Sequence, residues 1–154
     1  MTIRAKFLGV LCRPSYVLAI AAVAVLVGPT RAHKEPHTAG QLKLYEDVLM
    51  EEVRKGDLLF HGDGATAKQM GVVLSNTGMA CAMCHPMSSD IHPQSYPKFQ
   101  VETSKFATLR DMINWCIEKP NQGEKIDPES EAMKALEAYV TWSNAGSVLV
   151  PGKH

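Results

Sequence analysis

The chain has 154 residues, which is enough for one small domain with a single hydrophobic core. Its 16 basic and 16 acidic side chains balance, but four of the basic residues fall in the first 32 positions, so 12 basic and 16 acidic side chains remain after them. This mildly acidic remainder has no basic stripe or cluster, which argues against nucleic acid as a partner.

The N-terminal segment, residues 1–32, has the pattern of a secretory signal peptide. It starts with basic residues, continues with an uncharged, mostly apolar run of 13 residues from Tyr16 to Gly28, and ends in small residues at Ala32. The alternative is an uncleaved membrane anchor, although a full span needs about 20 residues. We therefore expect an exported, periplasmic or similarly placed protein that keeps no membrane span and loses Cys12 with the signal.

The next segment, residues 33–40, is polar and contains a proline, so we expect a disordered start before a domain of residues 41–154. From Gln41 onward, apolar residues recur at gaps of three and four. This spacing predicts an amphipathic helix that ends near residues 62–64. The small, glycine-rich residues after it predict a loop or a short helix.

Residues 81–85 read "CAMCH", which is the C-x-x-C-H pattern of covalent haem attachment. Cys81 and Cys84 can each add to a haem vinyl group, and His85 is then placed to ligate the iron from the proximal side. A redox dithiol or disulfide of the thioredoxin type would need a surrounding βαβ pattern, and a zinc site would need a second pair of ligands. Because neither pattern occurs, the single motif predicts one covalently attached haem c.

Two further helices are expected after the motif. Three prolines interrupt the segment that follows the motif, so we expect it to wrap the haem edge without regular helix. Thr103 or Ser104 is expected to cap a second helix that Pro120 stops. Asp127 is expected to cap a last helix that closes near Gly146. With no alternating strand pattern, the fold class is all-α, with three main helices around one covalently bound haem.

The distal side of the iron has two candidate ligands. A haem iron in a helical cytochrome normally takes a second axial ligand, most often methionine. Met112 is the methionine candidate, because the others flank the motif or, like Met133, lie at core spacing. Cys116 lies on the buried stripe of the second helix, and its thiolate would be a strong anionic donor, although a buried cysteine can also act as a small hydrophobe. On the residues alone, Cys116 and Met112 are both candidates for the distal ligand.

Two stretches resemble a known fold family. "KGDLLFHG" before the motif and "MKALEAYV" near the end resemble the first and last helices of class I cytochromes c, over roughly residues 41–146. The resemblance implies that Gly56 and Phe60 on the first helix meet Tyr139 on the last. One departure is the link of about twenty residues between Phe60 and Cys81, which is longer than usual in that family.

A narrower resemblance lies in "MINWCIEKPNQGEKIDPESEAMKALEAYVTW". This stretch resembles the sulfur-compound-oxidising cytochromes of the thiosulfate dehydrogenase and Sox group. In that group the matching cysteine is the distal ligand of the catalytic haem, which implies this role for Cys116. Together with the ligand chemistry, the resemblance leads us to favour Cys116 as the distal ligand, with Met112 as the alternative. Thiosulfate dehydrogenases usually carry two haems, whereas this chain has one motif.

These observations lead to three candidate functions. The favoured one is electron transfer in sulfur-compound oxidation, with another cytochrome or an oxidoreductase subunit as redox partner. The second is a haem subunit that oxidises thiosulfate or a related sulfur anion through Cys116. The third is an NO-binding or CO-binding haem protein. The second needs cations near the distal face. The side chains available for this are Lys98, Lys105, Arg110 and Lys119. His92 is a candidate for contact with the haem propionates, whereas His61 is expected to be a helix cap.

Overall fold

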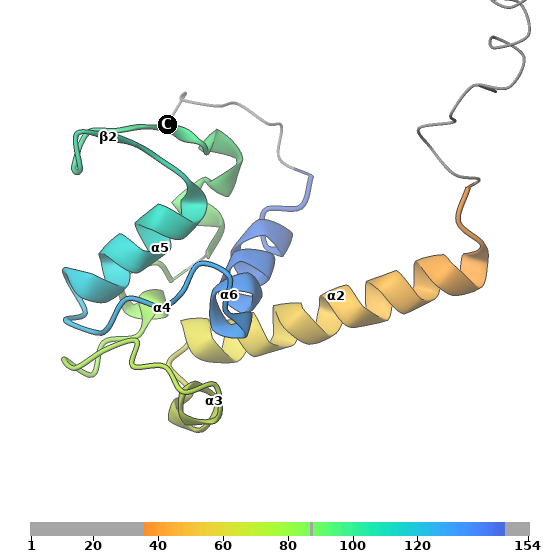
Figure 1. Cartoon of the computed structure of the whole chain (residues 1–154), viewed down its shortest axis with the longest axis horizontal. Coiled ribbons are helices and arrows are strands. Elements are labelled where there is room, and N and C mark those ends of the chain that lie inside the picture. The colour runs from red at the N-terminus through yellow and green to blue at the C-terminus, as the bar shows by residue number, and fades with distance from the viewer. Residues whose placement is uncertain (1–35, 87, 147–154) are drawn as a thin grey trace, which may run out of the picture. The chain divides into compact units, whose positions relative to one another are not determined.

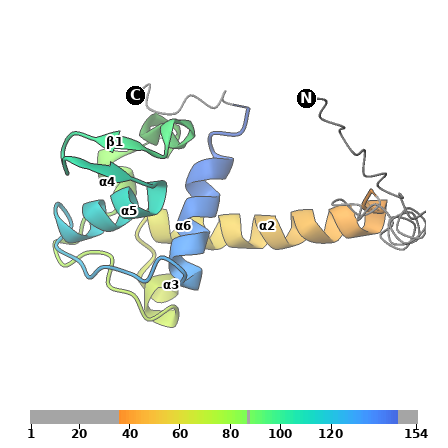
Figure 2. The ribbon, with the colours of Figure 1, turned by 45° about the horizontal axis from the view of Figure 1, so that its top comes forward.

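The computed structural model describes residues 36–86 and 88–146, and Figures 1 and 2 show two views of it. The predicted signal peptide and its cleavage site lie outside the described residues. The compact unit that carries the haem motif begins at Thr38. No helix in the described ranges is both long enough and apolar enough to cross a membrane.

Helices make up most of the regular structure, as expected for an all-α protein. The helices are α2 (Ala39–Phe60), α3 (Gly64–Gln69), α4 (Cys81–Cys84), α5 (Leu109–Glu118) and α6 (Glu131–Trp142). Between α4 and α5 lie two short 3-10 turns, η1 (Ser88–Ile91) and η2 (Pro93–Ser95), and one antiparallel pair of strands, β1 (Lys98–Gln100) and β2 (Lys105–Ala107).

Helix α2 begins two residues before the expected Gln41. Thr38 caps it, because the Thr38 hydroxyl accepts a hydrogen bond from the Gln41 N–H at 3.3 Å while the Gln41 side chain accepts one from the Thr38 N–H at 2.9 Å. The helix ends at Phe60, close to the predicted boundary. Gly62, with φ +82°, then turns the chain in the left-handed conformation that glycine tolerates best.

Helices α2 and α6 cross in close contact (Figures 1 and 2). Gly56 lies at this contact, against Ala135 and Tyr139. A Cβ atom at Gly56 would lie 2.0 Å from the carbonyl oxygen of Ala135, so only glycine fits this crossing. One turn further along, the rings of Phe60 and Tyr139 meet with centroids 5.2 Å apart. Gly56, Phe60 and Tyr139 therefore meet as the resemblance to class I cytochromes c implied.

The hydrophobic core lies among α2, α5 and α6. Its most deeply buried apolar side chains are Leu59, Ile117, Met133, Leu136 and Val140. Met133 is fully buried, which agrees with its expected place in the core.

The expected cap at Thr103 or Ser104 is wrong. Residues 98–107 form a hairpin in which Phe99 pairs with Phe106, and Ser104 lies in its turn with φ +52°, a conformation outside the helical region. Helix α5 begins only at Leu109, where the Thr108 hydroxyl accepts from the Asp111 N–H at 3.2 Å and the Asp111 carboxylate accepts from the Thr108 N–H at 2.8 Å. This reciprocal pair is a capping box, which satisfies the backbone N–H groups of Thr108 and Asp111.

The expected cap of the last helix at Asp127 is also wrong. Ser130 caps α6, because its hydroxyl accepts from the Met133 N–H at 3.2 Å. Asp127 instead closes the preceding turn, where its carboxylate accepts from the Glu129 N–H at 2.9 Å. The helix ends at Trp142, four residues before the predicted Gly146.

The long link between α2 and the haem motif is held in place by the loop after α5. The link contains α3 and then runs alongside residues 121–124. The Glu124 N–H donates to the Val73 carbonyl at 2.8 Å, and the Asn76 N–H donates to the Asn121 carbonyl at 2.9 Å. A Cβ atom at Gly123 would lie 2.6 Å from the Leu74 backbone, so this pairing also requires glycine.

Replacing Asn114 with alanine is expected to lower the free energy of unfolding by about 2 kcal/mol. Asn114 is buried on α5, where its amide donates to the Ile126 carbonyl at 2.8 Å and accepts from the Ile126 N–H at 2.9 Å. Alanine would leave both backbone groups buried without a partner. Chemical denaturation of the haem-loaded protein measures the loss.

Asn76→Ala is the matched control for this prediction. The exposed Asn76 amide donates one hydrogen bond, to the Gln122 carbonyl at 2.7 Å, and water can replace that bond. Its loss is expected to cost less than about 1 kcal/mol. Equal losses in the two variants would show that the Asn114 bonds contribute no more than exposed ones.

Candidate haem site

The haem-attachment motif forms the short helix α4 and the residue after it. Cys81 opens α4 and packs partly buried against the core, whereas Cys84 at its end is exposed. The chain leaves the helix at His85, which has φ −123° and ψ 72°. One turn of helix thus presents Cys81 to the interior and brings His85 to the end of the turn.

A cavity of about 370 Å³ brings together most of the predicted site residues. Cys81 and His85 line it from the haem motif, and Met112 and Cys116 line it from α5. Cys84 stands outside this lining. The remaining lining residues are Phe60, Asp90, Ile91, Tyr96, Gln100, Glu102, Leu109, Ile113, Trp115, Leu136 and Val140.

The donor set and the walls of this cavity fit a haem group. Most of the lining is apolar, and the volume lies within the roughly 300–1,000 Å³ typical of ligand pockets. The imidazole of His85 and the sulfur of Cys116 come from separate segments of the chain, so each can approach the same iron without competing for one position. Haem iron accepts both kinds of donor.

The pKa values of the two cavity thiols, Cys81 and Cys116, depend on burial and on the charge of neighbouring thiols. Burial raises the pKa of the Cys81 thiol to about 11, and a charge on Cys116 would raise it further. Burial also raises the pKa of the Cys116 thiol, and a charge on Cys84 adds to that effect. In the protein alone, Cys116 is therefore a neutral thiol at pH 7. A thiolate at this position needs a cation beside it, which the haem iron would supply.

Tyr96 and Asp90 are cavity residues that the sequence reasoning missed. Burial raises the pKa of the Tyr96 phenol, and a charge on Cys116 would raise it further. The ammonium group of Lys98 lies 4.8 Å from the centre of the Tyr96 ring. Asp90 contacts His85. Both belong to the segment expected to wrap the haem edge, but no spacing in that segment distinguishes them from their neighbours.

Two other methionines and the two candidate histidines lie outside the cavity lining. Met79 and Met83 border a different hollow, beside α3, and Met87 lies outside the described residues. His61 follows the last residue of α2 and contacts the Asp57 carboxylate at 2.9 Å, which agrees with its expected place at the helix end. His92, a candidate for contact with the propionates, is not among the residues that line the cavity.

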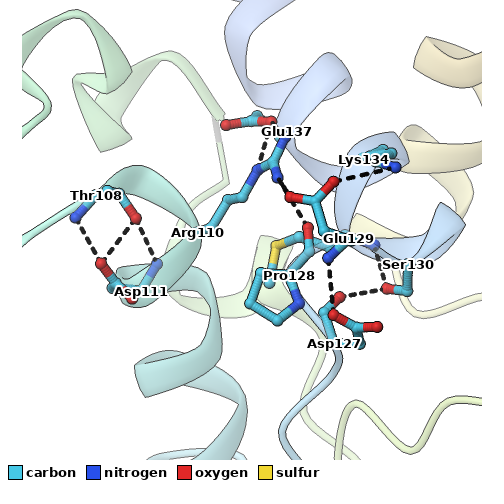
Figure 3. Close-up of polar contacts among 10 residues, drawn as sticks. Thr108, Arg110, Asp111, Asp127, Pro128, Glu129, Ser130, Lys134 and Glu137 are labelled. Carbon is cyan, nitrogen blue, oxygen red and sulfur yellow. Dashed lines mark hydrogen bonds and ion pairs between the residues drawn. The ribbon is translucent and has the colours of Figure 1, made fainter.

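The four candidate cations do not line the cavity either. Arg110 is held between two carboxylates, donating to Glu137 at 2.9 Å and to Glu129 at 2.6 Å, as Figure 3 shows. Lys105 borders a separate hollow next to β2, and Lys119 lies 3.7 Å from Glu118. Among the described residues that line the cavity, the side chains with a permanent charge at neutral pH are Asp90 and Glu102, and both are acidic.

Comparison with known proteins places this arrangement in a family. The model of the SoxA/TsdA cytochrome c domain matches residues 72–149, a segment that contains the haem motif, α5 with Cys116, and α6. The chain belongs to the SoxA/TsdA cytochrome c domain family. A cytochrome c domain carries haem c. The predicted resemblance to sulfur-oxidising cytochromes is thereby confirmed.

Two thiosulfate dehydrogenases are similar to this SoxA/TsdA domain. One, from Psychrobacter arcticus, is 32% identical over 50 residues, which are 32% of this chain and 15% of that protein. The other is the solved structure of thiosulfate dehydrogenase (TsdBA) from Marichromatium purpuratum, with 22% identity and a TM-score of 0.52 over 92% of this chain and 31% of that chain. The structural match confirms the cytochrome c-like fold. This chain spans less than a third of either relative.

Proposed function

We propose that this protein is an exported monohaem c-type cytochrome that transfers electrons in the oxidation of thiosulfate or a related sulfur compound. The proposal is carried by one observation: residues of the haem motif and Cys116 line the same cavity. In this proposal Cys81 and Cys84 attach one haem covalently, and His85 and Cys116 ligate its iron, with Met112 as the alternative distal ligand. Export rests on the signal-peptide pattern of residues 1–32.

Electron transfer is favoured over catalysis by charge and by electron count. The charged side chains among the described cavity residues are acidic, which disfavours an anionic sulfur substrate. Joining two thiosulfates releases two electrons, whereas one haem accepts one. The protein therefore needs a redox partner, which we propose is another cytochrome or an oxidoreductase subunit.

The second candidate is a catalytic haem subunit in which Cys116 handles the sulfur compound. It is favoured by the family match, because two relatives are named thiosulfate dehydrogenases. This chain corresponds to a small part of each of them.

A turnover experiment separates the two candidates. With thiosulfate and an artificial electron acceptor, the haem-loaded protein alone is expected to show no steady-state oxidation, because the described residues that line the cavity include no lysine or arginine to bind the anion. Its reduced haem is still expected to be oxidised by the acceptor. Sustained turnover that disappears in Cys116→Ala but persists in Met112→Leu would identify the protein as the enzyme instead.

A further inference from the structure

The proximal histidine has an acidic partner in this structure. The Nδ1 atom of His85 lies 3.2 Å from Oδ1 of Asp90, and both side chains line the haem cavity. An imidazole that donates from Nδ1 keeps the lone pair of Nε2 available for a metal. A contact in which Nδ1 donates to the Asp90 carboxylate would leave Nε2 of His85 available to the haem iron.

Asp90 is carried by a turn that α6 holds in place. The Ser88 hydroxyl at the start of η1 donates to the Ser143 hydroxyl, and the Asn144 amide donates to the Ser88 carbonyl at 3.3 Å. The same Asn144 amide donates to the Val140 carbonyl at 2.9 Å, which fixes it to the end of α6. At the other end of η1, Ile91 packs against the hydrophobic core. The turn is thus attached at both ends, with Asp90 between them.

We propose that Asp90 is a positioning residue for the proximal ligand and lowers the reduction potential of the haem. The proposal rests on the proposed function in one respect, namely that His85 ligates the iron. A carboxylate that accepts the Nδ1 proton orients the ring and makes the imidazole a more basic ligand. Its negative charge beside the ligand also favours the more positive ferric iron. Both effects shift the equilibrium toward the oxidised haem.

The test is the midpoint potential of the haem-loaded protein with Asp90 changed. Asp90→Asn is expected to shift the reduction equilibrium toward ferrous haem about tenfold, which is about 59 mV for a one-electron couple. Asp90→Glu keeps the carboxylate, and its potential is expected to lie closer to the wild-type value than that of Asp90→Asn. Asp47→Asn is the matched control, because it removes one carboxylate from an exposed pair with Lys43 on α2 and is expected to leave the potential unchanged.

Two outcomes would overturn the inference. One is an unchanged potential in Asp90→Asn while the ferric spectrum keeps its axial signature, and the other is an equal shift in Asp47→Asn. A wild-type ferric spectrum without the signature of a histidine ligand would instead contradict the proposed function.

A measurement on the wild type covers the case in which Asp90→Asn does not take up haem. In the reduced protein, the Nδ1 proton of His85 is expected to give a resolved NMR signal that exchanges slowly with water. A proton that exchanges too rapidly to be observed would contradict the contact with Asp90.

Discussion

Cys116→Ala is expected to change the axial ligation of the haem iron and to raise its reduction potential by about 100 mV or more, within the range of roughly 0.8 V that axial ligands set. Cys116 lines the cavity from α5 and is only partly buried, so its removal leaves the main core intact. A thiolate stabilises ferric iron, and its loss therefore favours the ferrous state. Absorption and EPR spectra of both proteins, with a potentiometric titration, measure these changes.

Met112→Leu is the matched control for this experiment. Met112 lines the same cavity from the same helix, one turn before Cys116, and leucine has nearly its volume. If Cys116 is the ligand, the Met112 variant keeps the wild-type spectra and potential. A methionine-type charge-transfer band in the wild type, or an unchanged axial signature in Cys116→Ala, would show that the cysteine interpretation is wrong.

Gly56→Ala is expected to lower the free energy of unfolding by about 3 kcal/mol or more, or to prevent folding altogether. The added methyl group would overlap the Ala135 carbonyl, which lies 2.0 Å from its position, and the Cβ of Tyr139, which lies 2.7 Å from it. Backbone on both sides of the crossing cannot rotate away, so α2 and α6 must separate. That separation would also disturb the contact between the rings of Phe60 and Tyr139.

Gly40→Ala on the same helix isolates the steric effect. Gly40 has no atom within 4 Å of an added Cβ, and its backbone is helical. Alanine there is expected to stabilise the protein by up to about 1 kcal/mol, through helix propensity alone. Denaturation curves of the two variants should therefore move in opposite directions. A Gly56→Ala protein as stable as the wild type would mean that the crossing is looser than described.

The sequence predicted the parts of the fold that depend on local periodicity. The apolar spacing of α2 and α6 located both helices, and the helical stripe of α5 placed Cys116 toward the interior. The hairpin escaped prediction because each strand has only three residues and exposes an aromatic ring, Phe99 or Phe106, so that alternation could not be read. The cap at Thr108 was readable from Asp111 three positions later. It was missed because Thr103 and Ser104 offered earlier candidates.

The site residues also differ in how far the sequence could predict them. Cys81, Cys84 and His85 stand in one motif whose spacing carries its chemistry. Asp90 and Tyr96 reach the cavity through 3-10 turns that pack against α6, and these contacts join residues far apart in the chain. A pattern in one sequence cannot report such contacts, so the partners of the ligands emerge only from the structure.

The pairing of residues 73–76 with residues 121–124 joins the two segments that carry the sulfur atoms of the site. Cys81 stands five residues after Asn76, and Cys116 stands five residues before Asn121. Because the Asn76 N–H donates to the Asn121 carbonyl, the segment that leads to Cys81 is tied to the segment that follows Cys116. We therefore expect a displacement of Cys116 to be passed through these backbone hydrogen bonds to the segment that carries Cys81.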